Sequence, residues 1–227
     1  MNSEADPIPI WYPAVYAMAA MAFMVLLGMD HTGISRTVVK AIPVTILLFL
    51  VITRFQGPAR LLLAGALLGS AGGDILLDLP YAGLFIFGLV SFLLAHLFYL
   101  VLFFRYASAA DGFEKAMIAG LMIFAGAMVW LFRGIDPSLF GPVVLYIGVI
   151  VAMSIGALLV PAPNRLLFWG ALLFIASDVV LAVNKFLLII PHGRLINISL
   201  YFIAQYVIIL AARAIWGKGR KSGTVQN

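Results

Sequence analysis

The stretch Leu67-Leu-Gly-Ser-Ala-Gly-Gly-Asp74-Ile-Leu-Leu-Asp78 places an acidic residue inside a run of apolar and small residues. A second stretch, Phe174-Ile-Ala-Ser-Asp178-Val-Val-Leu-Ala-Val-Asn184, does the same. Each stretch belongs to an apolar segment long enough to cross a bilayer, where burying a carboxylate costs several kcal/mol even on lenient insertion scales. Acids at such positions are functional by default, so Asp74 and Asp178 are the first candidates for a functional site.

The composition around these stretches is that of an integral membrane protein. Of the 227 residues, 64% are hydrophobic and only 10% are charged, against about 25% charged residues in a soluble domain. The mean hydropathy is +1.14. The apolar runs are long and do not alternate with polar residues, which indicates helices rather than barrel strands.

Proline, glycine and charged residues divide the chain into eight apolar segments, each close to the roughly 20 residues that a bilayer core requires. We therefore expect an all-α fold of eight transmembrane helices in a single domain, residues 1–227. The expected spans are 10–28, 37–53, 59–77, 82–104, 114–132, 140–160, 165–183 and 195–216.

The basic residues predict the orientation in the membrane. Eight spans put both termini on one side, and nine of the 14 Lys and Arg residues fall on that side. By the positive-inside rule the termini are expected in the cytoplasm. As a separate expectation, we assign the protein to a bacterial inner membrane. The net charge of +5 is assigned to contacts with anionic headgroups, and no nucleic-acid partner is expected.

Several classes of chemistry lack the residues they need. Cysteine is absent, which excludes disulfides, thiolate nucleophiles and cysteine-bound zinc. The three histidines, His31, His96 and His192, do not have metal-ligand spacing, so neither a metal nor another cofactor is expected. Ser70 lies in Leu-Gly-Ser-Ala-Gly, which lacks the first glycine of a G-x-S-x-G nucleophile elbow.

The two acidic stretches resemble each other. Gly73-Asp74-Ile-Leu-Leu77 and Ser177-Asp178-Val-Val-Leu181 share a small residue, an aspartate and three aliphatic residues. Ala95-His96 and Ala204-Gln205 form a second echo in the spans that follow. These echoes suggest a parallel four-plus-four internal repeat; chance recurrence of small and aliphatic residues is the alternative.

Helical rise predicts how deep the polar residues lie. At about 1.5 Å per residue, Asp74 and Asp178 both lie about 20 Å from the cytoplasmic ends of their helices. We expect further residues near the same level to converge with them on one pocket that opens to the outer half of the membrane. His96 is expected somewhat deeper. Asp78 and Asp136 are expected in loops. These candidate binding residues are Lys40, Tyr146, Asn184, Tyr201 and Gln205.

Two buried carboxyl groups in one pocket favour acid–base chemistry. Two close carboxylates do not both ionise readily, so the pair is expected to hold one proton between them. One carboxyl can then donate a proton while the other accepts one from water. Hydrolysis by this route requires neither a nucleophilic serine nor a metal.

The motifs around Asp74, His96 and Asp178, together with Tyr146 and Met153 and with Tyr201-Phe-Ile-Ala-Gln205, resemble the YhhN family of polytopic membrane proteins, which includes the animal lysoplasmalogenases. The resemblance extends from Lys40 to Gln205. The family pattern has Lys directly followed by Pro near the second span, whereas here Ala41-Ile42 separates Lys40 from Pro43.

The resemblance implies hydrolysis of the vinyl ether bond of a lysoplasmalogen that enters from the bilayer. Asp74 and Asp178 would be catalytic, with either one as the acid. Protonation of a vinyl ether carbon gives a cation that water captures, so one carboxyl would supply the proton and the other would stabilise the cation and activate the water. The remaining candidates would orient the carboxyls, the water and the glycerol, and Lys40 would meet the phosphate.

Two other classes of function fit the same residues. A pair of intramembrane carboxyls can serve a proton-coupled transporter, although eight spans in 227 residues leave little room for two alternating gates. A non-enzymatic lipid-binding or assembly protein is the third class.

Overall fold

The computed structural model describes residues 9, 11–81 and 83–217 of the chain. Within these residues, eight helices are each long and apolar enough to cross a membrane. They are α1 (Trp11–Gly28), α2 (Ile34–Arg54), α3 (Gly57–Asp78), α4 (Leu84–Arg105), α5 (Gly112–Phe132), α6 (Pro137–Leu159), α7 (Leu166–Phe186) and α8 (Gly193–Trp216), with a short 3₁₀ turn, η1 (Pro163–Arg165), before α7. The described residues contain no β-strand; Phe55 and Gly217 form a single β-bridge.

The expectation of eight helices long and apolar enough to cross a membrane is therefore confirmed, and the helix ends lie within a few residues of the expected bounds. Local capping explains several of these ends. Asp111 and Glu114 form a reciprocal capping box at the start of α5. Asp136 caps α6 by accepting hydrogen bonds from Ser138, which lower the pKa of this exposed carboxyl.

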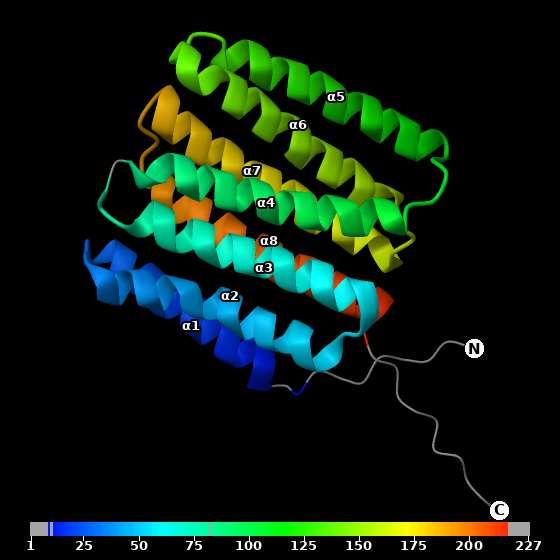
Figure 1. Ribbon diagram of the computed structural model, residues 1–227, viewed down its shortest axis with the longest axis horizontal. Helices are drawn as coiled ribbons and strands as arrows, with labels where there is room; N and C mark the ends of the chain where they lie inside the picture. The colour runs from blue at the N-terminus through cyan, green and yellow to red at the C-terminus, as the bar shows by residue number, and fades with distance from the viewer. Residues whose placement is uncertain (1–8, 10, 82, 218–227) are drawn as a thin grey trace, which may run out of the picture.

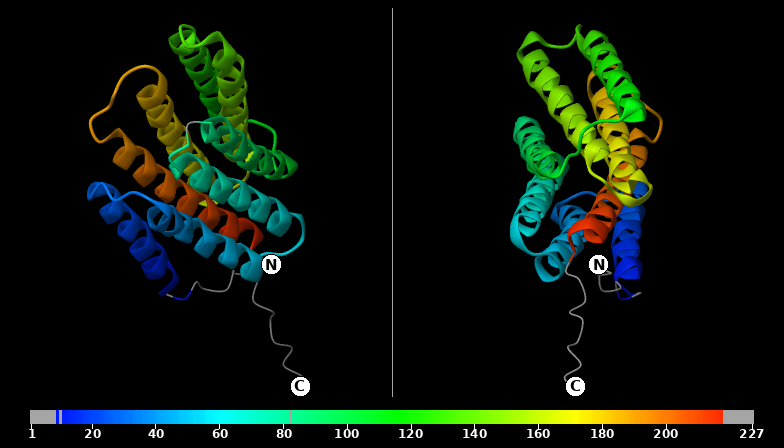
Figure 2. Two further views of the ribbon diagram at one scale, coloured as in Figure 1. Left: turned by 60° about the vertical axis from the view of Figure 1, so that its left-hand side comes forward. Right: turned by 90° about the vertical axis from the view of Figure 1, so that its right-hand side faces the viewer.

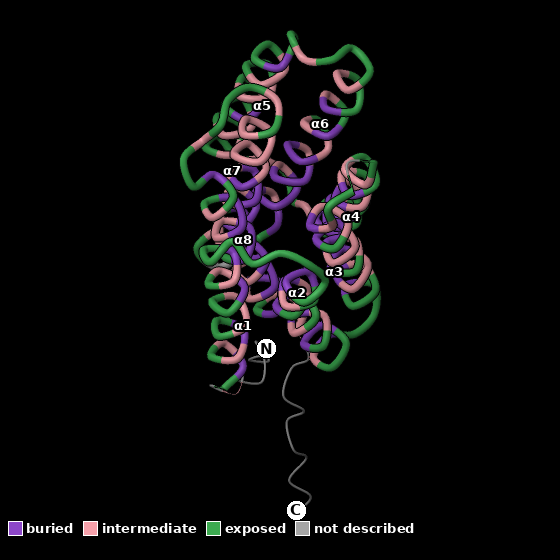
Figure 3. Tube along the Cα trace, turned by 90° about the vertical axis from the view of Figure 1, so that its left-hand side faces the viewer, coloured by how far each residue is buried: buried purple, intermediate pink, exposed green. Residues whose placement is uncertain are grey.

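The helices lie side by side in a bundle, with α1 and α2 at one edge and the α5–α6 hairpin at the opposite edge (Figures 1 and 2). Between these edges lie α3, α4, α7 and α8, where α3 packs against α4 and α7 against α8. We call the end that carries the α1–α2, α3–α4, α5–α6 and α7–α8 connections the distal end. Buried segments face the centre of the bundle, whereas the connections are largely exposed (Figure 3).

Small residues bring α3 close to α4. A Cβ atom at Gly69 would lie 3.0 Å from the backbone nitrogen of Ala95 and 3.0 Å from the carbonyl oxygen of Ser91. The Ser91 hydroxyl donates a 2.7 Å hydrogen bond to the carbonyl of Gly69. Close backbone approach and hydrogen bonding are the main attractions between helices in a membrane, and here they fix the helix that carries Asp74.

Candidate active site

Asp178 lines a cavity enclosed by α4, α5, α6 and α7. The cavity has a volume of ≈ 60 Å³, which is room for a few water molecules. Its lining is apolar except for three side chains, Asp178, Tyr146 and Lys185. The polar groups that converge on this small cavity are thus placed around water-sized space.

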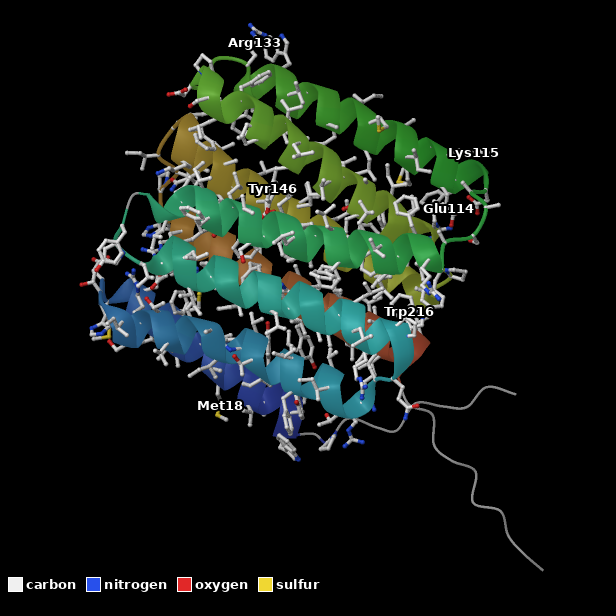
Figure 4. The ribbon with its side chains drawn as sticks, in the orientation of Figure 1. Met18, Glu114, Lys115, Arg133, Tyr146 and Trp216 are labelled. Atoms are coloured by element: carbon white, nitrogen blue, oxygen red, sulfur yellow. The ribbon has the colours of Figure 1, made fainter. Side chains whose placement is uncertain are left out.

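Two side chains from other helices contact the carboxyl of Asp178. The hydroxyl of Tyr146, on α6, donates a 2.8 Å hydrogen bond to Oδ2, and Figure 4 shows Tyr146 in the interior of the bundle. The imidazole Nε2 of His96, on α4, lies 3.7 Å from the same oxygen. Asp178 therefore joins three helices at the cavity.

His96 is completely buried, and neither of its ring nitrogens has a hydrogen-bond partner among the described residues. Its ring contacts the rings of Tyr146 and Phe174 edge-on, at centroid distances of 5.3 and 4.6 Å. Buried polar atoms are rarely left unpaired in native proteins. The unpaired imidazole therefore lies directly behind Asp178, outside the residues that line the cavity.

Asp74, on α3, has a different set of partners. Lys40 Nζ lies 3.2 Å from Asp74 Oδ1, and these side chains are only 5% and 1% exposed. The same ammonium group donates a 3.2 Å hydrogen bond to the carbonyl of Asp74. The hydroxyl of Tyr201, on α8, donates a 2.6 Å hydrogen bond to Oδ2. This buried carboxylate thus has a cation of its own.

One turn along α3 from Asp74, Ser70 continues the polar face of the helix. Gln205 Nε2 donates a 2.8 Å hydrogen bond to the Ser70 hydroxyl. The Tyr99 hydroxyl in turn donates a 2.7 Å hydrogen bond to Gln205 Oε1. Since Ser70 and Asp74 are four residues apart, as are Tyr201 and Gln205, the two contacts form successive rungs between α3 and α8.

Asp78, which we expected in a loop, is instead the last residue of α3 and is buried. Its Oδ2 accepts hydrogen bonds from Arg36 Nε at 3.2 Å and from the Thr37 hydroxyl at 2.7 Å. Its Oδ1 accepts a 2.6 Å hydrogen bond from Arg194 Nη2. The aspartate therefore joins α2, α3 and α8 at the distal end of the bundle.

A spacing signal in the sequence could have revealed this cluster. Arg36 and Lys40 are four residues apart on α2, and Asp74 and Asp78 are four residues apart on α3. Residues at this spacing share one face of a helix. Because α2 and α3 are antiparallel neighbours, Arg36 pairs with Asp78 and Lys40 with Asp74.

The two aspartates at equal depth do not share the cavity. Asp74 is not among the residues that line it, and neither carboxyl is the hydrogen-bond partner of the other within the described part of the chain. Aromatic rings connect the two sites: Tyr201 contacts Phe174 at a centroid distance of 5.5 Å, and Phe174 contacts His96. Helical rise gives the depth of a residue but not its lateral position, and α4 and α8 lie between α3 and α7 (Figure 1).

Asn184 lies apart from both aspartates. It is in the last turn of α7, where Oδ1 accepts a 2.9 Å hydrogen bond from the backbone nitrogen of Ile190 and so fixes the α7–α8 connection. Its role in substrate binding stays a prediction. Within residues 9, 11–81 and 83–217, no group of three or more His, Cys, Asp or Glu residues is placed to hold a metal ion.

Eight apolar helices around the buried, ion-paired carboxyl groups of Asp74 and Asp78 define a polytopic integral membrane protein with polar intramembrane sites. Comparison with protein families then matches residues 35–212 to the YhhN family. The chain belongs to this family, and the matched region contains both aspartates and all of their partners described above.

Two curated relatives carry the name lysoplasmalogenase, one from Mycobacterium bovis and one from Mycobacterium tuberculosis. Each is 38% identical to this chain over 121 residues, which is 51% of this chain and 46% of the relative. The chain thus spans about half the length of the curated relatives it matches. No solved structure matches it.

Proposed function

We propose that the protein is a membrane-embedded hydrolase that cleaves the vinyl ether bond of a lysoplasmalogen, releasing a fatty aldehyde and a glycerophospho-base. The similarity to two lysoplasmalogenases and the family membership support this activity. The observation that carries it is the carboxyl of Asp178, held by Tyr146 in a cavity whose other lining residues are apolar except for Lys185. Such a group can act as a general acid toward a lipid carbon.

The reaction begins with Asp178 as a carboxylic acid. It donates its proton to the vinyl carbon remote from the ether oxygen, and the adjacent carbon and that oxygen share the resulting positive charge. The new carboxylate stabilises this cation and accepts a proton from a water molecule as the water adds to the charged carbon. The hemiacetal then collapses to an aldehyde and a glycerol hydroxyl, so one water is consumed and Asp178 ends as the acid.

Tyr146 and His96 complete this site. The Tyr146 hydroxyl donates to one oxygen of Asp178 and so directs the other toward the substrate. The unpaired Nε2 of His96 lies close enough to Asp178 to orient the attacking water. This arrangement raises the reaction rate because the reacting groups are held in place before the reaction starts.

Asp74 acts as a positioning residue in this proposal. Lys40 compensates its charge, and its hydrogen bond from Tyr201 holds the ring that packs against Phe174, next to His96. Gln205 supports the same layer one turn away through Ser70. Asp74, Tyr201 and Gln205 thus act on the catalytic group through side-chain packing and do not contact the lipid.

The lipid chain must enter laterally, because a cavity of ≈ 60 Å³ holds water but not an alkenyl chain. Phe124 and Met128 of α5, together with Ile147 and Ile150 of α6, form its apolar wall. Since α5 lies at the edge of the bundle (Figures 1 and 2), a small displacement of the α5–α6 hairpin would open the wall to lipid. We also propose that the termini lie in the cytoplasm, because most Lys and Arg residues fall on their side of the membrane.

The activity is tested with purified protein in an uncharged detergent and a lysoplasmalogen substrate. Release of fatty aldehyde is expected, and in heavy water the aldehyde should carry one deuterium on the carbon next to the carbonyl, since that carbon receives the catalytic proton. Acyl-ester and alkyl-ether lysophospholipids are the control substrates and should not be cleaved. An absence of aldehyde, accompanied by proton-coupled flux in vesicles, would instead favour a transporter.

A further inference from the structure

Lys185 lies where the Asp178 cavity meets the distal end of the bundle. It lines the cavity and also lines a neighbouring pocket of ≈ 230 Å³ beside the α3–α4 connection. Phe85, in the first turn of α4, lines both spaces as well. The cavity at Asp178 and the distal pocket therefore meet at Lys185 and Phe85.

The ammonium group of Lys185 forms no ion pair within the described residues. It lies 4.7 Å from the centroid of the Phe85 ring, and the residue is exposed. The cations around Asp74 and Asp78 already have carboxylate partners: Lys40 pairs with Asp74, and Arg36 and Arg194 share Asp78. Lys185 is thus a positive charge that remains available to an anion at the cavity.

The position of Lys185 relative to Asp178 suits a phosphorylated glycerol lipid. The two residues are seven apart on α7, so they lie on one face of the helix and about 10 Å apart along its axis. Side chains on a helix lean toward its N-terminus, which brings the Lys185 ammonium group back toward Asp178. In a lysoplasmalogen, the three-carbon glycerol unit separates the vinyl ether from the phosphate, and a flexible lysine can span the remaining distance.

We propose that Lys185 binds the phosphate of the substrate headgroup while Asp178 protonates the vinyl ether. This inference rests on the proposed function and deepens it, because it makes the enzyme selective for phosphorylated alkenyl glycerols. It assigns the phosphate to Lys185 instead of Lys40, whose ammonium group is buried against Asp74. The chemistry is a charge-assisted contact between an ammonium group and a phosphate oxygen.

The test compares wild type, Lys185→Gln and Lys185→Arg on two substrates in an uncharged detergent that contains no other phospholipid. One substrate is a lysoplasmalogen and the other is an alkenyl glycerol that lacks the phosphate. Lys185→Gln should raise KM for the lysoplasmalogen about tenfold, as expected for the loss of one such contact, and leave KM for the alkenyl glycerol unchanged. Lys185→Arg should retain most of the affinity. Lys115→Gln, an exposed lysine at the opposite end of the bundle, is the matched control and should resemble wild type.

Binding of a non-cleavable alkyl-ether lysophospholipid separates this inference from the proposed hydrolysis. If wild type binds this analogue through Lys185 but cleaves no vinyl ether, the hydrolase proposal fails and the phosphate site stands. If hydrolysis occurs and Lys185→Gln changes neither KM nor analogue binding, the phosphate site is wrong. Equal KM increases on both substrates would also overturn it, because a phosphate contact cannot affect a lipid without phosphate.

Discussion

The hydroxyl of Tyr146 lies 2.8 Å from Oδ2 of Asp178, and both groups line the same apolar cavity. A phenol that donates to a carboxyl in such surroundings fixes the direction of the second oxygen. The rate of the proposed proton transfer depends on how the second oxygen is oriented toward the substrate. Tyr146 should therefore affect the chemical step rather than binding.

We expect Tyr146→Phe to lower kcat by roughly 10- to 100-fold with little change in KM, because a hydrogen bond to a charged or reacting group contributes about 1.5–3 kcal/mol. Steady-state kinetics of aldehyde release measure this effect. Tyr99→Phe is the matched control, since it also removes a buried hydroxyl but one that donates to Gln205. Equal losses of kcat in both variants would contradict a specific role for Tyr146.

The ion pair between Lys40 and Asp74 predicts a dependence of stability on both partners. Asp74→Asn leaves the buried Lys40 ammonium group without its counter-ion and should destabilise the fold by about 3–5 kcal/mol. Thermal unfolding in detergent measures this loss. The double variant Lys40→Met with Asp74→Leu should recover much of it, because an apolar pair of similar size often replaces a buried ion pair without loss. A single variant as stable as wild type would show that the pair does not hold the fold.

The cluster at Asp78 predicts unequal contributions from its two arginines. The side chain of Arg36 is 9% exposed, whereas that of Arg194 is 46% exposed. Arg36→Gln should cost about 3–5 kcal/mol of unfolding free energy, and Arg194→Gln at most about 1 kcal/mol because solvent screens its interaction. Denaturation of the two variants side by side tests this order, and the reverse order would be inconsistent with the burial of Arg36.

The membrane spans were predictable because continuous apolar runs bounded by proline, glycine and charge permit no other structure in a bilayer. Depth was also predictable, since helical rise is fixed. The lateral arrangement was not predictable. Although the two aspartates lie at the same depth, Asp74 has Lys40 and Tyr201 as neighbours. Asp178 instead has Tyr146 and His96. Which helices separate the two aspartates is decided by packing that a single sequence does not reveal.

Asp78 shows why the end of a helix is difficult to place. It directly follows residue 77, the expected end of its span, but hydrogen bonds from Arg36 and Arg194 stabilise its carboxylate at the last residue of α3. The internal repeat stays a prediction. Each aspartate is nevertheless contacted by a residue from the other half of the chain: Tyr201 of the second half donates a hydrogen bond to Asp74, and His96 of the first half lies next to Asp178.

The close approach of α3 and α4 predicts that Gly69→Ala is destabilising. Its new methyl group would meet the backbone of Ser91 and Ala95 at 3.0 Å, and atoms of a helix backbone cannot move aside singly. We expect a loss of about 1–3 kcal/mol, typical of an overpacked contact, seen as a lower Tm in detergent. Gly126→Ala on α5, where a Cβ meets nothing within 4 Å, is the control and should not lower Tm.

The most direct test of the account is the rate of aldehyde release from lysoplasmalogen by Asp178→Asn. Asparagine keeps the shape of the side chain and an oxygen that can accept the Tyr146 hydrogen bond, but it has no acidic proton to donate. We predict that kcat falls by about 10²–10⁴-fold while Tm stays close to that of wild type. Unchanged turnover in a folded Asp178→Asn protein would contradict the assignment of Asp178 as the catalytic acid.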